Sequence, residues 1–217
     1  MIEGVVPAHR GEISGRTSVG TSPSDSSFGA QSHHRAPRAV VDATEFIQAF
    51  RYHPAGVTVI TLDGERGPVG FTATSVTSVS ARPPLLCFSV ATASSCWPVV
   101  RDVDACVVNI LAAYQHGVAR RFALRGVDRF GAPTCWERLA TGEPVLSGAR
   151  LWLCARIVER VLAGDHHVVI ARVTAVHPSS IGGQPLVYHD GEYVGLGPLP
   201  VSEIGPLHSA ETSTADS

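Results

Sequence analysis

From residue 41 to residue 197, short apolar runs alternate with turn residues, a pattern that predicts a sheet-rich domain. Three runs of strand length are GVTVITL, LLCFSVA and ACVVNIL. Two longer runs, GARLWLCARIVERVL and HHVVIARVTAV, join through Ala163-Gly164-Asp165. PVGFTATSVTSVS is predicted as one further strand, preceded by the turn DGERG, in which Asp63-Gly64 is the hairpin signal. PLVYHDGEYVGL is predicted as a closing hairpin that turns at Asp190-Gly191.

Three short helices are predicted between these strands. The first opens with Asp42 and Glu45 as a capping box and ends by Gly56, with Phe46, Ile47 and Phe50 as its apolar face. The second is SSCWPVVRD, which has serine at its start. The third is QHGVARRFAL, with Val118, Phe122 and Leu124 facing inward.

Because strands outnumber helices and most connections are hairpin-like, the predicted fold is mainly β with a few helices. An antiparallel barrel is favoured over a doubly wound α/β sheet. Residues 1–40 are rich in Ser, Gly, Pro, His and Arg, and residues 198–217 have a similar composition. Both segments are predicted to be disordered, as an N-terminal arm and a C-terminal tail. The folded domain is therefore placed at 41–197.

Net charge, apolar run length and cysteine spacing bear on the binding partners and the cellular location of the protein. The formal net charge of −2 gives no support for a nucleic-acid partner or an acidic membrane surface. No run approaches the ~20 apolar residues of a membrane span, and the N-terminus lacks the apolar region of a signal peptide. The five cysteines form no CxxC pair, and Cys87, Cys106 and Cys154 sit in apolar runs. A reducing cytoplasm is the expected location.

The segment from Gly70 to Ser80 is the first candidate for chemistry, because neither of its faces is a clean apolar stripe. If it is one continuous strand, Thr72, Thr74, Ser78 and Ser80 share a face, and Ser75 lies on the other. These hydroxyls could bond a polar, planar ligand, with Val79 near the point where the chain leaves the strand. The alternative is that Thr is simply a good strand former and Ser fills an edge.

Two further segments have both a functional and a structural interpretation. Ser94 and Ser95 precede the second helix, where hydroxyls and free N–H groups can bind phosphate, or where serine is only an N-cap. His166 lies where the two long strands meet and could donate a hydrogen bond to a nucleotide, or be an exposed turn residue. His167 points to the opposite face and is the weaker candidate. Arg120 and Arg121 form a solvated face or contact a cofactor phosphate.

Common catalytic signatures are missing. The chain has no GxGxxG fingerprint, P-loop, HExxH or GxSxG motif, and we expect no metal site. Taken in order, however, its segments resemble the flavin reductase family with the FMN-binding split β-barrel fold, the reductase components of two-component flavin monooxygenases. The matching segments are HPAGVTVITLDG, GFTATSVTSVSARPPL, SSCWPVV, VVNIL, ARRFA, DRFG, GEPVLSGA, GDHHVVIARV and PLVYHDGEYVGL.

The resemblance implies roles for particular residues. The flavin ring and ribityl chain would be held by Thr72, Thr74, Ser75, Ser78, Val79 and Ser80. The flavin phosphate would be held by Ser94 and Ser95, Phe122 would lie close to the flavin, and His166 would approach the nicotinamide. Cys96 stands where the family pattern SSTWP has threonine, and Ala171 stands where a glycine is usual.

The resemblance also implies cofactors and partners. The expected cofactor is FMN or FAD, with NADH or NADPH as co-substrate. The chain is expected to form a homodimer and to supply reduced flavin to a separate monooxygenase. An alternative is a non-enzymatic flavin-binding carrier or sensor. The replacement of the family's threonine by Cys96 supports this alternative.

Overall fold

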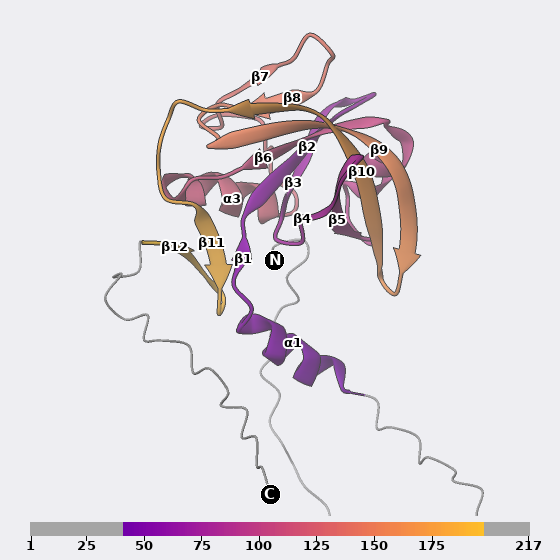
Figure 1. The fold of residues 1–217 in the computed structure, drawn as a ribbon, viewed down its shortest axis with the longest axis vertical. Coiled ribbons are helices and arrows are strands. Elements are labelled where there is room, and N and C mark those ends of the chain that lie inside the picture. Colours follow the sequence, from indigo (N-terminus) through magenta and orange to yellow (C-terminus); the bar gives the residue numbers. More distant parts are fainter. Residues whose placement is uncertain (1–40, 198–217) are drawn as a thin grey trace, which may run out of the picture.

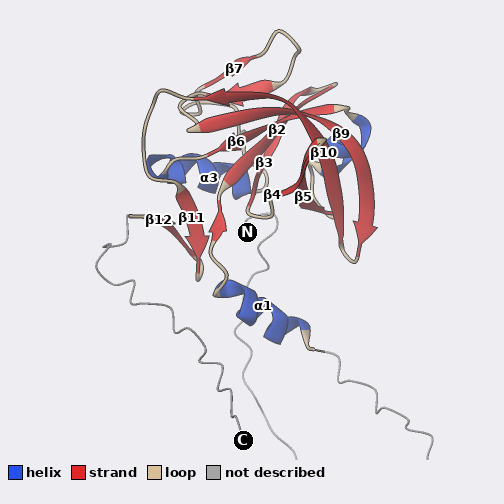
Figure 2. Cartoon of the chain, in the orientation of Figure 1, coloured by secondary structure: helices blue, strands red, loops and turns tan. Residues whose placement is uncertain are grey.

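The computed structural model describes residues 41–197. The predictions made for the arm 1–40 and the tail 198–217 lie outside the described residues. The described chain is dominated by strands, with helices at its margins (Figures 1 and 2). The helical elements are α1 Ala43–Arg51, α2 Trp97–Asp102, the 3-10 turn η1 Ala113–Gln115 and α3 His116–Ala123. The strands are β1 Ala55–Gly56, β2 Thr58–Gly64, β3 Gly67–Ala73, β4 Thr77–Ala81, β5 Pro84–Ala91, β6 Ala105–Ile110, β7 Trp136–Arg138, β8 Pro144–Leu146, β9 Leu151–Ala163, β10 His166–Pro178, β11 Leu186–His189 and β12 Glu192–Gly195.

Seven strands form the main sheet in the order β3-β2-β6-β9-β10-β5-β4, and each neighbouring pair is antiparallel. The two edge strands, β3 and β4, are joined by only three residues, 74–76. The edges must therefore lie close together, so the sheet curls toward a barrel that is split between them. The predicted mainly β, antiparallel split-barrel fold is confirmed. A smaller sheet, β1-β11-β12, and the hairpin β7-β8 complete the domain.

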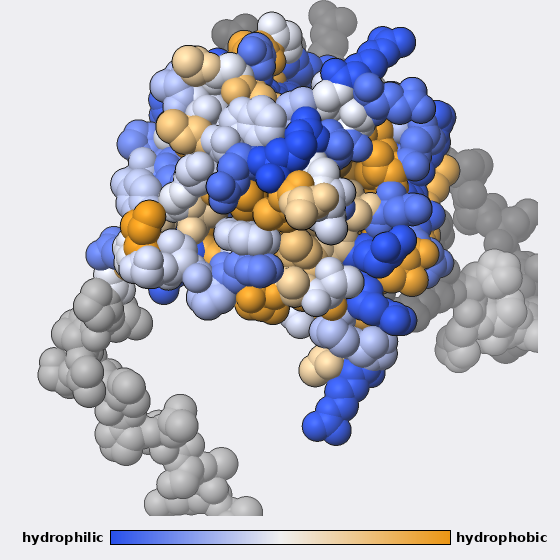
Figure 3. Space-filling view, turned by 90° about the horizontal axis from the view of Figure 1, so that it is seen from above, coloured by the Kyte–Doolittle hydropathy of each residue, from blue (hydrophilic) through white to orange (hydrophobic). Residues whose placement is uncertain are grey.

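Two apolar clusters lie on the two sides of strands β2 and β3. One fills the curled sheet and includes Phe71, Phe88 and Val169, all fully buried. The other packs α3 against β2 and β11, with Phe122 and Leu186 inside it. Polar and apolar side chains alternate across the face seen in Figure 3, as on an ordinary solvent-facing surface.

The predicted strand through Gly70–Ser80 is wrong in one respect, because the structure has two strands there. β3 ends at Ala73 and β4 begins at Thr77, and the two strands pair with different neighbours, β2 and β5. The alternation of faces is therefore interrupted between Thr72 and Ser78. A bulge between Ser78 and Ser80 shifts the register again.

The first helix also differs from its prediction. It forms, but Asp42 makes no side-chain capping bond, and the helix ends at Arg51 rather than at Gly56. None of its residues is buried; Phe46 is 53% exposed and Phe50 59%. In Figure 1 the helix stands away from the sheets. Its apolar face therefore finds no core within the described part of the chain.

Smaller differences concern turns and one helix end. The predicted turn DGERG is confirmed, but its centre is Glu65 and Arg66, two residues beyond Asp63-Gly64, because Gly64 pairs with Gly67. The turn at Asp190-Gly191 is confirmed, with φ of 46° and 88° at these residues. Leu124 was predicted to face inward but is 49% exposed, since α3 ends one residue before it.

Candidate active site

A broad groove of about 1260 Å³ opens where the split edge of the main sheet faces α1, α3 and the β11–β12 hairpin. Ligand pockets for drug-sized molecules run from roughly 300 to 1,000 Å³. The groove is therefore large enough for more than one planar ring system. Its polar wall carries Thr74, Ser75, Thr77, Ser89 and His166, and its apolar wall includes Phe46, Ile47, Phe50, Ala123 and Leu124.

The hydroxyl-bearing part of the groove is the break between β3 and β4. Thr74, Ser75 and Val76 lie between the two strands and outside the pairing register of both. The hydroxyl of Ser75 accepts a hydrogen bond from the Ser89 N–H at 2.8 Å, which fixes this loop to β5. Thr74 lies beside it, half-buried. A strand break lined by hydroxyls can offer both backbone and side-chain hydrogen bonds to a planar ligand.

His166 lies on the same groove, at the first residue of β10. Its Nδ1 is 2.7 Å from Oδ1 of Asp165, and this contact holds the pKa of Asp165 below its usual value. The carboxylate orients the ring, so Nε2 is the nitrogen left for a ligand. The structure thus brings His166 together with Thr74 and Ser75, three residues that the sequence singled out separately.

The opposite wall carries an orphaned hydroxyl. Oη of Tyr193 is buried and has no hydrogen-bond partner among the described residues. Burial raises the pKa of Tyr193, with Tyr188 acting in the same direction and Arg120 opposing it. Tyr188 and Tyr193 face each other across the β11–β12 hairpin with ring centroids 5.3 Å apart. A buried polar group without a partner costs stability and is typical of sites that bind a ligand.

Several of the residues predicted to hold the flavin do not line this groove. Thr72 is fully buried, and its hydroxyl donates to the Ala119 carbonyl at 2.6 Å. Phe122 is also fully buried and packs edge-on against Phe130. Neither residue lines the groove; nor do Ser78, Val79 and Ser80, which continue into β4.

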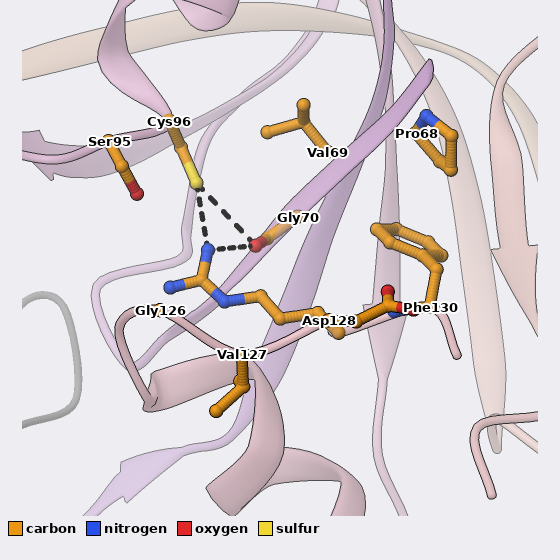
Figure 4. A pocket seen from close by; sticks show the side chains of 10 residues that line it. Pro68, Val69, Gly70, Ser95, Cys96, Gly126, Val127, Asp128 and Phe130 are labelled. Carbon is orange, nitrogen blue, oxygen red and sulfur yellow. Dashed lines mark hydrogen bonds between the residues drawn. The ribbon is translucent and has the colours of Figure 1, made fainter. Parts of the chain in front are cut away.

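The predicted phosphate residues lie at a second, smaller pocket of about 240 Å³ (Figure 4). Ser95 lines it, whereas Ser94 is buried and its hydroxyl accepts a hydrogen bond from the Cys96 N–H. Nη1 of Arg129 donates to the Gly70 carbonyl at 2.7 Å and to Sγ of Cys96 at 3.0 Å. Arg129 thus occupies the position facing the cysteine that replaces the family's threonine.

Sequence reasoning missed Tyr188, Tyr193, Ser89 and Arg129 as members of these two sites. The hairpin signal at Asp190-Gly191 could have placed the two tyrosines opposite each other, but not beside α3. Within residues 41–197, no cluster of His, Cys, Asp and Glu could hold a metal ion. None of the helices in that range is both long enough and apolar enough to cross a membrane.

Residues 50–197 match the model of the flavin reductase like domain. The chain belongs to the flavin reductase family. This flavin reductase is 42% identical over 160 residues to an NADH:FMN oxidoreductase of Rhodococcus qingshengii, covering 72% of this chain and 83% of the relative. The match to the family model includes the groove residues from Phe50 to Tyr193.

Solved structures agree with this family. The flavin reductase resembles the NADH:FAD oxidoreductase SgcE6 of Streptomyces globisporus C-1027 in complex with NAD and FAD fragments, with a TM-score of 0.67 and 29% identity over 73% of this chain and 97% of that one. It also resembles the styrene monooxygenase flavin reductase of Pseudomonas putida S12, with a TM-score of 0.64 and 29% identity over 72% and 99% of the two chains. The protein is an NAD(P)H-dependent flavin reductase that uses a flavin cofactor.

Proposed function

We propose that the large groove holds FMN together with NADH, and that the reduced flavin is passed to a separate monooxygenase. The observation that carries the proposal is the convergence of Thr74, Ser75 and His166 on one groove that is also lined by Tyr193, whose buried hydroxyl lacks a partner among the described residues. The groove is large, hydroxyl-lined on one wall and apolar on the other, which fits an amphipathic tricyclic ring. The NADH:FMN relative favours this pair of nucleotides over FAD and NADPH.

When bound, a flavin supplies the redox chemistry, because it accepts a hydride from a reduced nicotinamide. The residues of this chain bind and orient the reactants. Thr74 and Ser75 hydrogen-bond the polar edge of the flavin, and Ser75 is kept in place by its bond to the Ser89 N–H. Nε2 of His166 binds the nicotinamide nucleotide, with the ring fixed by Asp165. Phe46, Ile47 and Phe50 of α1 and Ala123 of α3 give the groove its apolar wall.

The test of the activity is NADH oxidation by the purified protein with and without added FMN, recorded beside the absorbance of the protein as isolated. Turnover that depends on added FMN supports a reductase that releases its flavin. A yellow protein without NADH oxidation would instead support the non-enzymatic carrier. Turnover that is independent of added FMN would indicate a retained flavin that reduces another acceptor.

The role of His166 is tested by His166→Ala. Loss of one hydrogen bond, with or without charge character, costs about 1–3 kcal/mol, a roughly 5- to 150-fold loss in kcat/KM for NADH. The dissociation constant for FMN should stay unchanged. Equal kcat/KM in the two proteins would remove His166 from the site.

We also propose that α1 is covered by a second copy of the chain. Phe46 and Phe50 are largely exposed, lie with their ring centroids 4.6 Å apart and line the groove, so a partner seated on them would also close one wall of the site. Sedimentation should show a dimer that Phe46→Glu converts to monomer. A monomeric wild type at micromolar concentration would contradict this assembly.

The monooxygenase partner is supported by the similarity to the styrene monooxygenase reductase. A reductase that releases its flavin needs an acceptor that binds reduced flavin before oxygen consumes it. The experiment is to add the flavin reductase, NADH and FMN to a monooxygenase component that requires reduced FMN. Product formation across a dialysis membrane would show that free reduced flavin is the carrier.

A further inference from the structure

His166 is the first residue of β10 and lies at the tip of the β9–β10 hairpin. It follows Gly164, which has a φ of +62°, at the turn between the two longest strands. Leu162 and Ala163 beside it are exposed. His166 forms the last pair with β5, opposite Ala91, and the last pair with β9, opposite Ala163, so neither ladder extends beyond it. The position of the His166 side chain therefore depends also on contacts outside the two ladders.

The neighbouring residue provides that support. The ring of His167 stacks on Trp97, with ring centroids 3.6 Å apart and an angle of 14° between the planes. Trp97 is the first residue of α2, is half-buried and packs against the main apolar cluster. Thr92 makes two further contacts with this end of the hairpin. Its N–H donates a hydrogen bond to the Asp165 carbonyl at 2.9 Å, and its hydroxyl lies 3.4 Å from Nδ1 of His167.

These contacts form a continuous path from the core to the groove. Successive residues of a strand point to opposite faces, so His167 packs on α2 while His166 faces the groove. We propose that the stacked pair Trp97–His167 is a positioning device that sets the place of His166 for binding the nicotinamide nucleotide. The inference rests on the proposed role of His166 and adds a residue that touches neither nucleotide.

A second tryptophan–histidine stack on the β9–β10 hairpin provides a control for the loss of the Trp97–His167 stack. At the opposite end of β9 and β10, His177 stacks on Trp152 with centroids 3.7 Å apart and 10° between the planes. Trp152 and His177 are direct cross-strand partners and do not line the groove. His177→Ala thus removes a similar stack from the same two strands, away from the site.

The test compares His167→Ala, His167→Phe and His177→Ala, each alone, and His167→Ala combined with His166→Ala. His167→Ala should raise KM for NADH about 3- to 10-fold with kcat nearly constant. It should weaken NAD+ binding to the FMN-loaded protein equally in an equilibrium titration and leave FMN affinity unchanged. His167→Phe keeps a stacking ring and should restore both values, and His177→Ala should change neither.

The double variant decides whether His167 acts through His166. If it does, His167→Ala adds no further loss once His166 is alanine, so the two effects are strongly non-additive. Equal losses in both backgrounds, a parallel fall in FMN affinity, or an unchanged KM in His167→Ala would each overturn the inference. The inference would also be overturned if His167→Ala raised KM for NADH while His166→Ala left it unchanged. Absence of NADH oxidation in the wild type is a separate result that refutes the proposed function, and NAD+ titration would still report on the stacked pair.

Discussion

The hydroxyl of Thr72 donates a hydrogen bond of 2.6 Å to the carbonyl of Ala119, and so ties β3 to α3. Two residues further on, Thr74 lies in the groove. The two threonines therefore have different surroundings, because strand β3 ends between them at Ala73. One hydroxyl is part of the core, and the other is available to a ligand.

Thr72→Val and Thr74→Val should therefore separate stability from binding. Thr72→Val removes a buried hydrogen bond and should lower the free energy of unfolding by about 0.5–1.5 kcal/mol. Thr74→Val should leave stability within about 0.5 kcal/mol and raise the FMN dissociation constant roughly 3- to 10-fold. Urea unfolding and fluorescence titration measure the two quantities. The reverse pattern would show that the groove is not where the flavin binds.

Gly70 is expected to tolerate no side chain. A Cβ at this position would lie 2.8 Å from Cε1 of Phe122 and 2.9 Å from the carbonyl oxygen of Ile60. Gly70→Ala should destabilise the protein by about 1–3 kcal/mol, because both neighbours are buried and one is backbone. Gly117→Ala is the matched control, since its Cβ meets nothing within 4 Å and alanine favours the helix by up to about 1 kcal/mol. Equal thermal midpoints for the two variants would contradict this packing.

The buried thiol of Cys106 should make stability fall at high pH. Burial raises the pKa of Cys106 to about 12, with Glu143 and Cys154 acting in the same direction. Because the folded pKa lies above the unfolded one, the stabilisation is complete below about pH 8.5 and is lost as the pH rises. The slope is about 1.4 kcal/mol per pH unit until the folded thiol ionises.

Cys106→Ala should flatten this alkaline slope, whatever it costs in overall stability. Cys135→Ala is the control, since Cys135 is exposed. The measurement is urea unfolding between pH 8 and pH 11 for the wild type and both variants. Parallel curves for the wild type and Cys106→Ala would show that Cys106 ionises equally in the folded and unfolded chains.

Removal of residues 1–40 should leave flavin binding intact. Among the described residues, those that line the groove run from Ala43 to Tyr193. The truncated protein should bind FMN with a dissociation constant within about twofold of the full chain, well under the tenfold that 1.4 kcal/mol represents. A folded truncation that failed to bind FMN would place part of the site in the arm.

The sequence predicted the long-range architecture better than the site. The strands around Val59, Phe88, Val108 and Val169 are recognisable because each run is apolar, short and bounded by turn residues. The break at 74–76 could not be located, since threonine suits a strand as well as a loop that binds a ligand. β3 ends where the chain leaves its hairpin with β2 and begins a second hairpin, β4–β5, and no residue type in the segment 74–76 marks that boundary.

The same limit applies to individual site residues. Thr74, Ser75 and His166 were singled out because hydroxyls and a histidine are unusual at their positions, and all three line the large groove. Phe122 was predicted to lie close to the flavin, and its side chain is fully buried in the cluster that packs α3 against β2 and β11. No feature of the sequence marked Tyr193 as a groove residue, because its position beside α3 follows from the pairing of β1 with β11.

The strand order of the main sheet has a consequence for how the chain is made. The hairpins β2–β3 and β4–β5 join only near neighbours, yet they are separated in the sheet by β6, β9 and β10. During synthesis β5 therefore leaves the ribosome with one edge unpaired, and that edge stays open until β10 emerges. Non-local pairing of this kind slows folding and exposes strand edges to other chains. The β9–β10 hairpin, made late, is thus the piece that converts two separate hairpins into one sheet, and conditions that delay its arrival should favour aggregation of the nascent protein.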